Sequence, residues 1–463
     1  MNVLALDLGT SSARSALFDG RGQRVTASTK QLTYPLRTAA DGQAEVDPAV
    51  LLRAVRSLLA TPGAEAVGIS CFWHSLLGCD ERGTPLTPIF TWADSRCAAD
   101  AMRLRQRLSE ESTHARTGCM LRASFWPAKL AWLKRTQPAL FRRVTRWVGP
   151  GEWLLWRLSG ELRAAHGMAT ATGLYDQTTR TWDPELLRVC GITSANVPPI
   201  SDDPVRVDGL TVFPAIGDGA ANNLGAGATS PGCAAINFGT SAAIRIVRAR
   251  GPARAPFGLF CYRIDERRFL IGGAISNAGG LRAWCVDRLR LPAAATLERE
   301  LAARPGPHPY LRALPFWLAE RAPSWREDLS GALIGIRQAT TAVDLLHAIT
   351  EATYQRLALI AERVPGARSP LRILVGGGLH HSPASFQRLA DCLGRPLIAA
   401  DEPETSLRGA AVFALERVGS AVAATGGRAV QPRAAHAAAY RQQRRELARL
   451  EATLFPQAEE APP

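Results

Sequence analysis

The residues best suited to chemistry lie in two short segments where an apolar strand runs into a polar turn. Residues 4–18, LALDLGTSSARSALF, and residues 234–248, AAINFGTSAAIRIVR, each predict a strand, a Gly-Thr-Ser turn and a second strand. The glycine permits tight backbone geometry, and two hydroxyls with successive amides can face an anion. Either segment alone could be a hairpin with an ordinary polar turn. Their repetition, with Asp7 just before the first turn, favours two copies of one phosphate-binding design.

A third segment places a carboxylate where a strand is expected to end and a helix to begin. In TVFPAIGDGAANNLGAGATS, residues 211–230, Asp218 stands between two glycines. A carboxylate there is open to a ligand and close to the positive end of the helix. The alternative is that Asp218 is only the N-cap of that helix, a common role for aspartate.

The remaining elements must position these residues. Asp47 and Pro48 predict a capped helix start, and a buried strand over residues 67–72 leads into Trp73-His74-Ser75. A strand over residues 371–375 precedes three glycines, against whose backbone a flat group could lie. Further helices are expected at 98–108, 127–136, 152–158, 383–393 and 406–418, and a solvated one at 433–454.

Composition narrows the class of protein. With 463 residues the chain should hold two or three domains. Its net charge of +14 comes almost entirely from arginine scattered along the chain, which favours attraction for anionic metabolites over nucleic acid binding. The nine cysteines form no C-x-x-C pair, and we find no apolar run of 18 residues, so we expect reduced thiols, a cytoplasmic location and no membrane association.

Several common enzyme classes are excluded by missing motifs. Lysine occurs only at positions 30, 129 and 134, and none fits a P-loop or a protein-kinase strand. The zincin motif H-E-x-x-H and the hydrolase elbow G-x-S-x-G do not occur, and the segment 225–230 lacks the third glycine of a dinucleotide fingerprint.

Several motifs, in the right order, resemble those of the FGGY carbohydrate kinases, within the sugar-kinase, Hsp70 and actin superfamily. They are LALDLGTSSARSALFD for the first phosphate motif, GDGAANNLGAGATSPGCAAINFGTSAAIRI for the catalytic aspartate and second phosphate motif, GGGLHHSPASFQRLADCLGRPL for the adenosine motif, and the closing pattern ETSLRGAA. The resemblance covers roughly residues 1–420. It implies an α/β fold of two ribonuclease-H-like (actin-like ATPase) domains flanking a nucleotide and sugar cleft. The expected domains are 1–228 and 229–420, followed by an Ala/Arg-rich tail at 421–463 to which we assign no function.

The resemblance also implies roles for individual residues. Asp218 would be the catalytic base that takes the proton from a sugar hydroxyl. ATP would bind through Gly9, Thr10, Ser11, Ser12, Gly239, Thr240, Ser241, Gly376, Gly377 and Gly378, and Mg²⁺ through Asp7 and Asp218. The sugar would contact His74, Trp92, Asp94, Arg96 and Arg122. For His74 alone, a purely structural histidine is the alternative.

Among branches of the family, HSLLGCDERGTPLTPIFTWADSRC, ISNAGG and ATATGLYDQTTRTWDPELL look most like the gluconate kinases, with xylulose kinases next. Gluconate is an anion, so a planar cation should hold its carboxylate, and Arg96 and Arg122 are the candidates. Arg96 could instead brace its loop through Asp94, and Arg122 could be a surface arginine. Trp73, Leu121-Arg122-Ala123 and Leu379-His380-His381 depart from the usual pattern where substrate is recognised.

We therefore expect an ATP-dependent kinase of a small sugar or sugar acid, with gluconate first and xylulose or another pentulose or polyol as the alternative. A sugar-binding regulator that has lost catalysis is the alternative from another class, although Asp7, Asp218 and both Gly-Thr-Ser turns argue against it. A homodimer is left open.

Overall fold

The computed structural model describes the chain except residues 26–27, 305, 365–370, 421, 423–425 and 457–463. It forms two compact units, each assembled from separate stretches of sequence. Unit 1 comprises Met1–Pro231, Val247–Ile271 and Glu404–Thr425, and unit 2 comprises Gly232–Ile246, Gly272–Pro403 and Gly426–Pro463. None of the described helices is long and apolar enough to cross a membrane.

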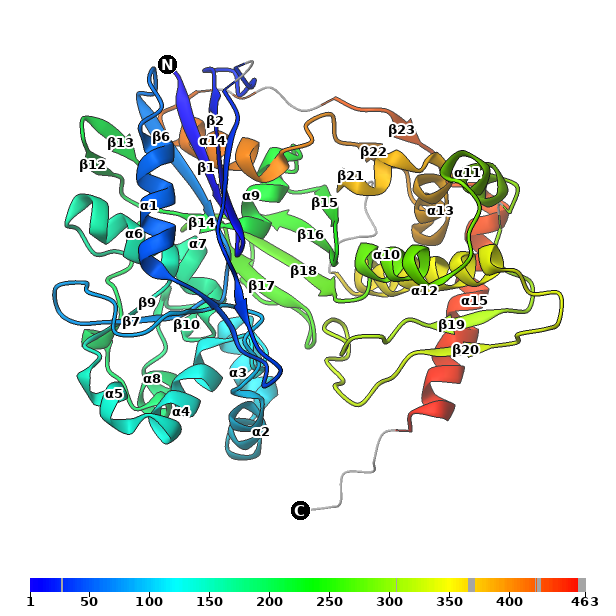
Figure 1. Ribbon diagram of the computed structural model, residues 1–463, viewed down its shortest axis with the longest axis horizontal. Coiled ribbons are helices and arrows are strands. Elements are labelled where there is room, and N and C mark those ends of the chain that lie inside the picture. Colours follow the sequence, from blue (N-terminus) through cyan, green and yellow to red (C-terminus); the bar gives the residue numbers. More distant parts are fainter. Residues whose placement is uncertain (26–27, 305, 365–370, 421, 423–425, 457–463) are drawn as a thin grey trace. The chain divides into compact units, whose positions relative to one another are not determined.

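Unit 1 is built on a mixed sheet with the order β12-β13-β6-β1-β2-β3, and β14 also pairs with β6 (Figure 1). Its strands are β1 (Val3–Leu8), β2 (Ser12–Phe18), β3 (Lys30–Thr33), β6 (Ala66–Cys71), β12 (Val205–Val207), β13 (Leu210–Val212) and β14 (Ile216–Gly217). β1 runs antiparallel to β2 and parallel to β6. Strands β1 and β6 are buried almost throughout, which explains why their sequences are apolar except at Asp7 and Ser70.

Helices and smaller sheets surround this sheet. The helices are α1 (Pro48–Leu59), α2 (Ala98–Arg107), α3 (Glu110–Thr117), α4 (Trp126–Thr136), α5 (Pro138–Arg143), α6 (Pro150–Ser159), α7 (His166–Ala169), α8 (Pro184–Cys190), α9 (Asp218–Gly225) and α14 (Thr405–Arg417). The other strands are β4 (Arg37–Thr38), β5 (Ala44–Val46), β7 (Leu77–Cys79), β8 (Ile89–Phe90), β9 (Arg146–Val148), β10 (Tyr175–Asp176), β11 (Thr181–Trp182) and β17 (Phe260–Arg263). A second apolar core gathers α2, α4, α5 and α8 around Trp126, Trp132 and Trp147.

Unit 2 repeats the arrangement. Its main sheet contains, in order, β18-β16-β15-β21-β22-β23. These strands are β15 (Cys233–Phe238), β16 (Ala242–Arg248), β18 (Phe269–Ile275), β21 (Arg372–Gly377), β22 (Leu397–Ala399) and β23 (Ala429–Val430), and a small hairpin joins β19 (Arg312–Leu314) to β20 (Ala332–Ile334). Its helices are α10 (Gly279–Arg288), α11 (Ala294–Ala302), α12 (Ala342–Arg363), α13 (Pro383–Leu393) and α15 (Ala434–Leu454).

The local predictions are largely confirmed. Asp47 caps α1 by accepting from the amide of Ala49 at 2.8 Å, and α13 has the predicted bounds. The strand expected at residues 371–375 continues as β21 through Gly376 and Gly377. Helices α4, α6 and α14 differ from the expected ranges by one or two residues at their ends.

The helix expected at residues 433–454 is confirmed as α15, but the expectation that it is solvated is wrong for one of its faces. Tyr440 of α15 is fully buried, and its hydroxyl donates to Oε1 of the buried Glu351 at 2.5 Å. The amide of Gln355 donates to the carbonyl of Tyr440 at 3.0 Å. Few apolar residues mark the buried face of α15, because polar side chains join it to α12. Residues 421, 423–425 and 457–463 of the predicted tail lie outside the described residues.

Candidate active site

The first hairpin, formed by β1, its Gly-Thr-Ser turn and β2, has a turn with a fixed backbone. The Gly9 amide donates to the carbonyl of Ser12 at 2.9 Å. Tyr34 holds the same turn twice, because its hydroxyl donates to the Gly9 carbonyl at 2.5 Å and its amide to the Ser11 carbonyl at 3.0 Å. Ser11 is exposed and Thr10 partly exposed. The predicted phosphate-binding turn therefore presents its hydroxyl-bearing residues at the surface of unit 1.

Asp7 lies within β1 and Asp218 directly follows β14, and both of these strands pair with β6. Asp7 lies opposite Ser70, and the Ser70 hydroxyl donates to Asp7 Oδ1 at 2.7 Å. Ile216 pairs with the same Ser70 in β14, so Asp218 begins α9 just beyond this point. Burial raises the pKa of Asp7 to about 6, against the opposing effect of the Ser70 hydrogen bond, and the nearby Asp218 raises it further. The sheet therefore brings the two predicted acids together.

The prediction of a strand-to-helix junction at Asp218 is confirmed, whereas the N-cap alternative is wrong. The N-cap of α9 is Gly217, and Asp218 is the first residue of the helix. Its carboxylate is exposed and accepts from the amide of Gly219 at 2.8 Å. Position 217 must be glycine, because a Cβ there would lie 1.7 Å from Cε2 of Trp73.

Helix α14 packs directly against α9, a contact that sequence reasoning did not identify. A Cβ at Gly409 would lie 1.7 Å from the carbonyl oxygen of Ala221, so the two helix backbones are in direct contact. The amide of Asn222 donates to Thr405 Oγ1 at 2.6 Å. The closing ETSLRGAA pattern contains both Thr405 and Gly409, and it was the available signal for this contact.

Aromatic rings surround His74. The ring of His74 packs edge-on against Phe125 at 4.7 Å and Tyr262 at 5.6 Å between centroids, and Trp73 lies beside them. His74 has φ of +65°, and its Nδ1 lies 2.6 Å from the carbonyl oxygen of Ala171. Because a carbonyl only accepts, we assign the proton to Nδ1. Sequence reasoning missed Tyr262, which comes from β17, far away in the chain.

The polar loop after β8 is braced internally. Asp94 is buried and accepts from the amide of Ala44 at 3.1 Å and from Arg96 Nη2 at 2.6 Å. Arg96 also donates to Glu45 at 2.5 Å. Its guanidinium lies over the ring of Trp132, 4.7 Å from the centroid. Arg96 thus braces the loop through Asp94, as one interpretation of the sequence predicted, while the neighbouring Trp92 is exposed.

Arg122 forms an ion pair with Glu110 and donates to the carbonyl of Leu121 at 3.0 Å. Its side chain is only 12% exposed, so the interpretation as a surface arginine is wrong. The loop around Arg122 is also held from inside by Lys129, whose Nζ donates to the carbonyls of Ala123 at 2.7 Å and Ser124 at 2.8 Å. Both arginines proposed to hold a substrate carboxylate therefore already pair with carboxylates of the protein.

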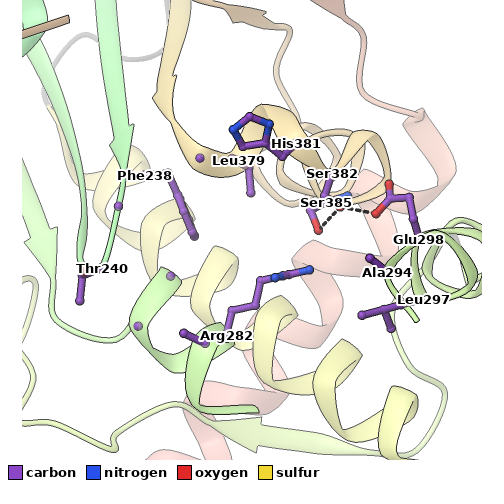
Figure 2. A pocket seen from close by; sticks show the side chains of 15 residues that line it. Phe238, Thr240, Arg282, Ala294, Leu297, Glu298, Leu379, His381, Ser382 and Ser385 are labelled. Atoms are coloured by element: carbon purple, nitrogen blue, oxygen red, sulfur yellow. Dashed lines mark hydrogen bonds between the residues drawn. The ribbon is translucent and has the colours of Figure 1, made fainter. Parts of the chain in front are cut away.

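The second hairpin, formed by β15, its turn and β16, borders a cavity of about 410 Å³ within unit 2. The amide of Gly239 donates to the Ser241 carbonyl at 2.9 Å, and two amides of α10 donate back to this turn. Figure 2 shows the cavity, which is lined by Phe238, Gly239, Thr240, Gly279, Gly280, Arg282, Ala283, Ala294, Leu297, Glu298, Gly378, Leu379, His381, Ser382 and Ser385.

Of the three consecutive glycines, only Gly378 borders this cavity. Gly376 and Gly377 pair with Asn237 and Phe238 inside the sheet. Gly377 has φ of +92°, and a Cβ there would lie 2.3 Å from the carbonyl oxygen of Phe238. From the sequence alone, Gly377, which the strand requires, could not be distinguished from Gly378, which borders the cavity.

The residues present suit the nucleotide and the metal that the resemblance implies. No group of three or more metal-binding His, Cys, Asp or Glu side chains occurs among the described residues. Mg²⁺ needs no such group, since it usually binds one or two carboxylates together with water and substrate phosphates. Asp7 and Asp218 fit that pattern. The cavity of unit 2 falls within the range of about 300–1,000 Å³ common for small-molecule sites.

Comparison with known proteins identifies the family of this chain. Residues 2–212 match the N-terminal domain and residues 234–416 the C-terminal domain of the FGGY family of carbohydrate kinases. The chain is 28% identical to a gluconokinase of Bacillus subtilis (90% of this chain, 88% of that protein) and 30% identical to a glycerol kinase of Rhodospirillum centenum (90% and 89%). Its fold matches a xylulose kinase of Lactobacillus acidophilus with a TM-score of 0.91 at 24% identity, over 98% of this chain and 99% of that one. The two-domain α/β fold is thereby confirmed, and the chain belongs to the FGGY family of carbohydrate kinases.

Proposed function

We propose that this protein transfers the γ-phosphoryl group of ATP to the terminal hydroxyl of a small polyhydroxylated substrate, with gluconate as the first candidate. The observation that carries the proposal is the exposed Asp218 carboxylate at the start of α9, beside Asp7 and the first Gly-Thr-Ser turn. Gluconate comes first because the chain resembles a gluconokinase over 90% of its length.

In this proposal Asp218 is the general base. Its carboxylate accepts the proton of the attacking hydroxyl, while helix α14 holds α9 and thereby the direction of the side chain. Phosphoryl transfer passes through a loose transition state, so positioning and charge stabilisation do most of the work.

Each of the two turns, within its own unit, would bind phosphate oxygens. Gly9, Thr10, Ser11 and Ser12 of unit 1, and Gly239, Thr240 and Ser241 of unit 2, offer backbone amides and hydroxyls to anionic oxygens. Mg²⁺, when bound by Asp7 and Asp218, would neutralise charge on the phosphates. Gly378 and the cavity beside it would take the adenosine.

A second candidate substrate is xylulose, a neutral sugar. The observation favouring it is that Arg96 and Arg122 both pair with carboxylates of the protein. A bound gluconate would have to break one of these pairs or find another cation. Aromatic rings surround His74, and its Nδ1 is hydrogen-bonded to the carbonyl of Ala171. These surroundings suit a neutral sugar equally well.

The test is an assay of ADP release with ATP and Mg²⁺ against gluconate, xylulose and glycerol, with a reaction lacking sugar as the control. We expect sugar-dependent ADP release, fastest with gluconate. Faster turnover of xylulose than of gluconate would favour xylulose, the second candidate substrate. Binding of sugar without ADP release would favour a regulator that has lost catalysis.

A further inference from the structure

Arg282 of unit 2 differs from the arginines of the candidate site because its charge is not compensated. With the residues that the structure describes, it forms no hydrogen bond and no ion pair. Its side chain is half-buried and lines the cavity beside the second hairpin. In Figure 2 it extends from α10 toward Ser385 and Ala294, away from Thr240.

The backbone of α10 fixes where Arg282 begins. The amides of Gly279 and Gly280 each donate at 2.9 Å to the turn of the second hairpin, to the carbonyls of Gly239 and Thr240. A Cβ at Gly279 would lie 2.4 Å from the Gly239 carbonyl oxygen, so the helix start touches the turn directly. Leu281 and Cys285 anchor the other face of α10 in the core of unit 2. Arg282 therefore projects into the cavity from a rigid base.

Glu298, Ser382 and Ser385, at that end of the cavity, already have partners. Glu298 accepts from the Ser382 hydroxyl at 2.7 Å and from the Ala384 amide at 2.8 Å, while Ser382 and Ser385 share a hydrogen bond of 2.8 Å. The remaining lining at this end comes from the apolar Leu297 and Leu379 and from the imidazole of His381. One planar cation beside apolar walls suits a flat, electron-rich ring.

We propose that Arg282 binds the nucleobase of the nucleotide, packing its guanidinium flat against the ring. This inference rests on the proposed function, since it assumes that ATP uses this cavity. The guanidinium points away from Thr240, where the phosphates are proposed to lie, so a role on the base is favoured over a role on the phosphates. Arg282 therefore contributes to the affinity for the nucleotide and takes no part in sugar binding.

The experiment is calorimetric titration of the full-length protein with adenosine, AMP and ADP. Three variants are compared with the wild type: Arg282→Ala, Arg282→Met, which keeps the length but removes the planar cation, and Arg288→Ala. Arg288 is the matched control, an exposed arginine of the same helix paired with Asp287. Arg282→Ala and Arg282→Met should weaken all three ligands by a similar factor, about fivefold to twentyfold. Arg288→Ala should leave every affinity unchanged.

Two results would overturn the assignment. Unchanged affinity for adenosine in both Arg282 variants would do so, and so would a loss that grows from adenosine to ADP and shrinks with salt, since that pattern indicates phosphate pairing. Arg282→Met keeps the test open if Arg282→Ala does not fold. If the wild type bound none of the three ligands and released no ADP, the proposed function would fail as well. Normal kinase activity with unchanged adenosine binding would overturn only the role of Arg282.

Discussion

The two hairpins share one topology. In the first, β1 runs antiparallel to β2 and parallel to β6, and in the second, β15 runs antiparallel to β16 and parallel to β21. Each turn is closed by a hydrogen bond of 2.9 Å from its glycine amide. The repeated sequence therefore corresponds to a repeated structure, as the pattern predicted.

The hairpins differ in charge at equivalent positions. Asp7 of the first corresponds to Asn237 of the second, and the strand neighbour is Ser70 in one case and Gly376 in the other. Near the first hairpin, carboxylates gather, and in unit 1 Arg96 and Arg122 are paired with carboxylates. Beside the second hairpin, the cavity holds Arg282, which has no such partner among the residues that the structure describes. Under the proposed function, the acidic half around Asp7 and Asp218 would serve catalysis and metal binding, and the half around the second hairpin would bind the nucleotide.

The largest expected effect tests the acidic half. Asp218→Asn keeps the shape of the side chain but removes its basicity, so turnover should fall by about two to four orders of magnitude while the melting temperature stays the same. Steady-state kinetics and a thermal melt measure both. Asp208→Asn, at an exposed turn with φ of +46° that asparagine tolerates, is the matched control. Near-normal turnover of Asp218→Asn would contradict the assignment of catalysis to the acidic half.

The second prediction concerns the stability of the acidic half. Cys71, at the end of β6, has a raised pKa to which Glu152, Asp218 and Asp7 all contribute after burial. Burial also raises the pKa of Glu152 itself to about 7, from 4.5. The stability that this group contributes is complete below pH 4.5 and is lost as the pH rises through 7.

Glu152→Gln replaces the titratable carboxyl with a neutral amide, so the variant should not lose this stability as the pH rises. Relative to the wild type, the variant should gain about 2 kcal/mol in free energy of unfolding between pH 5.5 and 8.5. Urea unfolding at both pH values measures the gain, and Glu81→Gln in an exposed turn serves as control. An equal difference at both pH values would show that burial does not hold the Glu152 carboxyl in its neutral form.

The third prediction separates two neighbouring glycines of the nucleotide half. Gly378 faces open space at the cavity, so Gly378→Val should raise the KM for ATP by about tenfold and leave the KM for the sugar unchanged. Gly377→Val should instead prevent correct folding, because Gly377 has φ of +92° and faces the backbone of Phe238. Kinetics on the first variant and a thermal melt of the second distinguish the roles. Equal rises in both KM values for Gly378→Val would contradict the nucleotide assignment.

Sequence reasoning reached those parts of the molecule that local patterns determine. The strand-turn-strand repeats, the helix capped by Asp47 and the junction at Asp218 depend on neighbours in the chain, and all three are present. Contacts between distant segments were not predictable. The packing of α14 on α9, the ring of Tyr262 beside His74 and the burial of α15 each join residues far apart in sequence.

The arginines were the least predictable, for a related reason. Their residue type indicates a possible carboxylate partner but not which carboxylate, and the structure gives Arg122 to Glu110. The final and smallest prediction follows from this pair. If Glu110 keeps Arg122, then Arg122→Ala should lower kcat/KM for gluconate and for xylulose by the same factor, and their ratio should change by less than about threefold.

A loss of kcat/KM for gluconate alone would be larger and would have a different cause. An arginine holding the gluconate carboxylate supplies a charged hydrogen bond worth roughly 2 kcal/mol, or about thirtyfold, to gluconate alone. The double variant Arg122→Ala/Glu110→Gln is the matched control, since it removes both partners and leaves no buried carboxylate unpaired. It should recover stability lost in the single variant without altering the substrate ratio. A thirtyfold selective loss for gluconate in both variants would mean that Arg122 leaves Glu110 for the substrate, and the acidic half would then also recognise an anion.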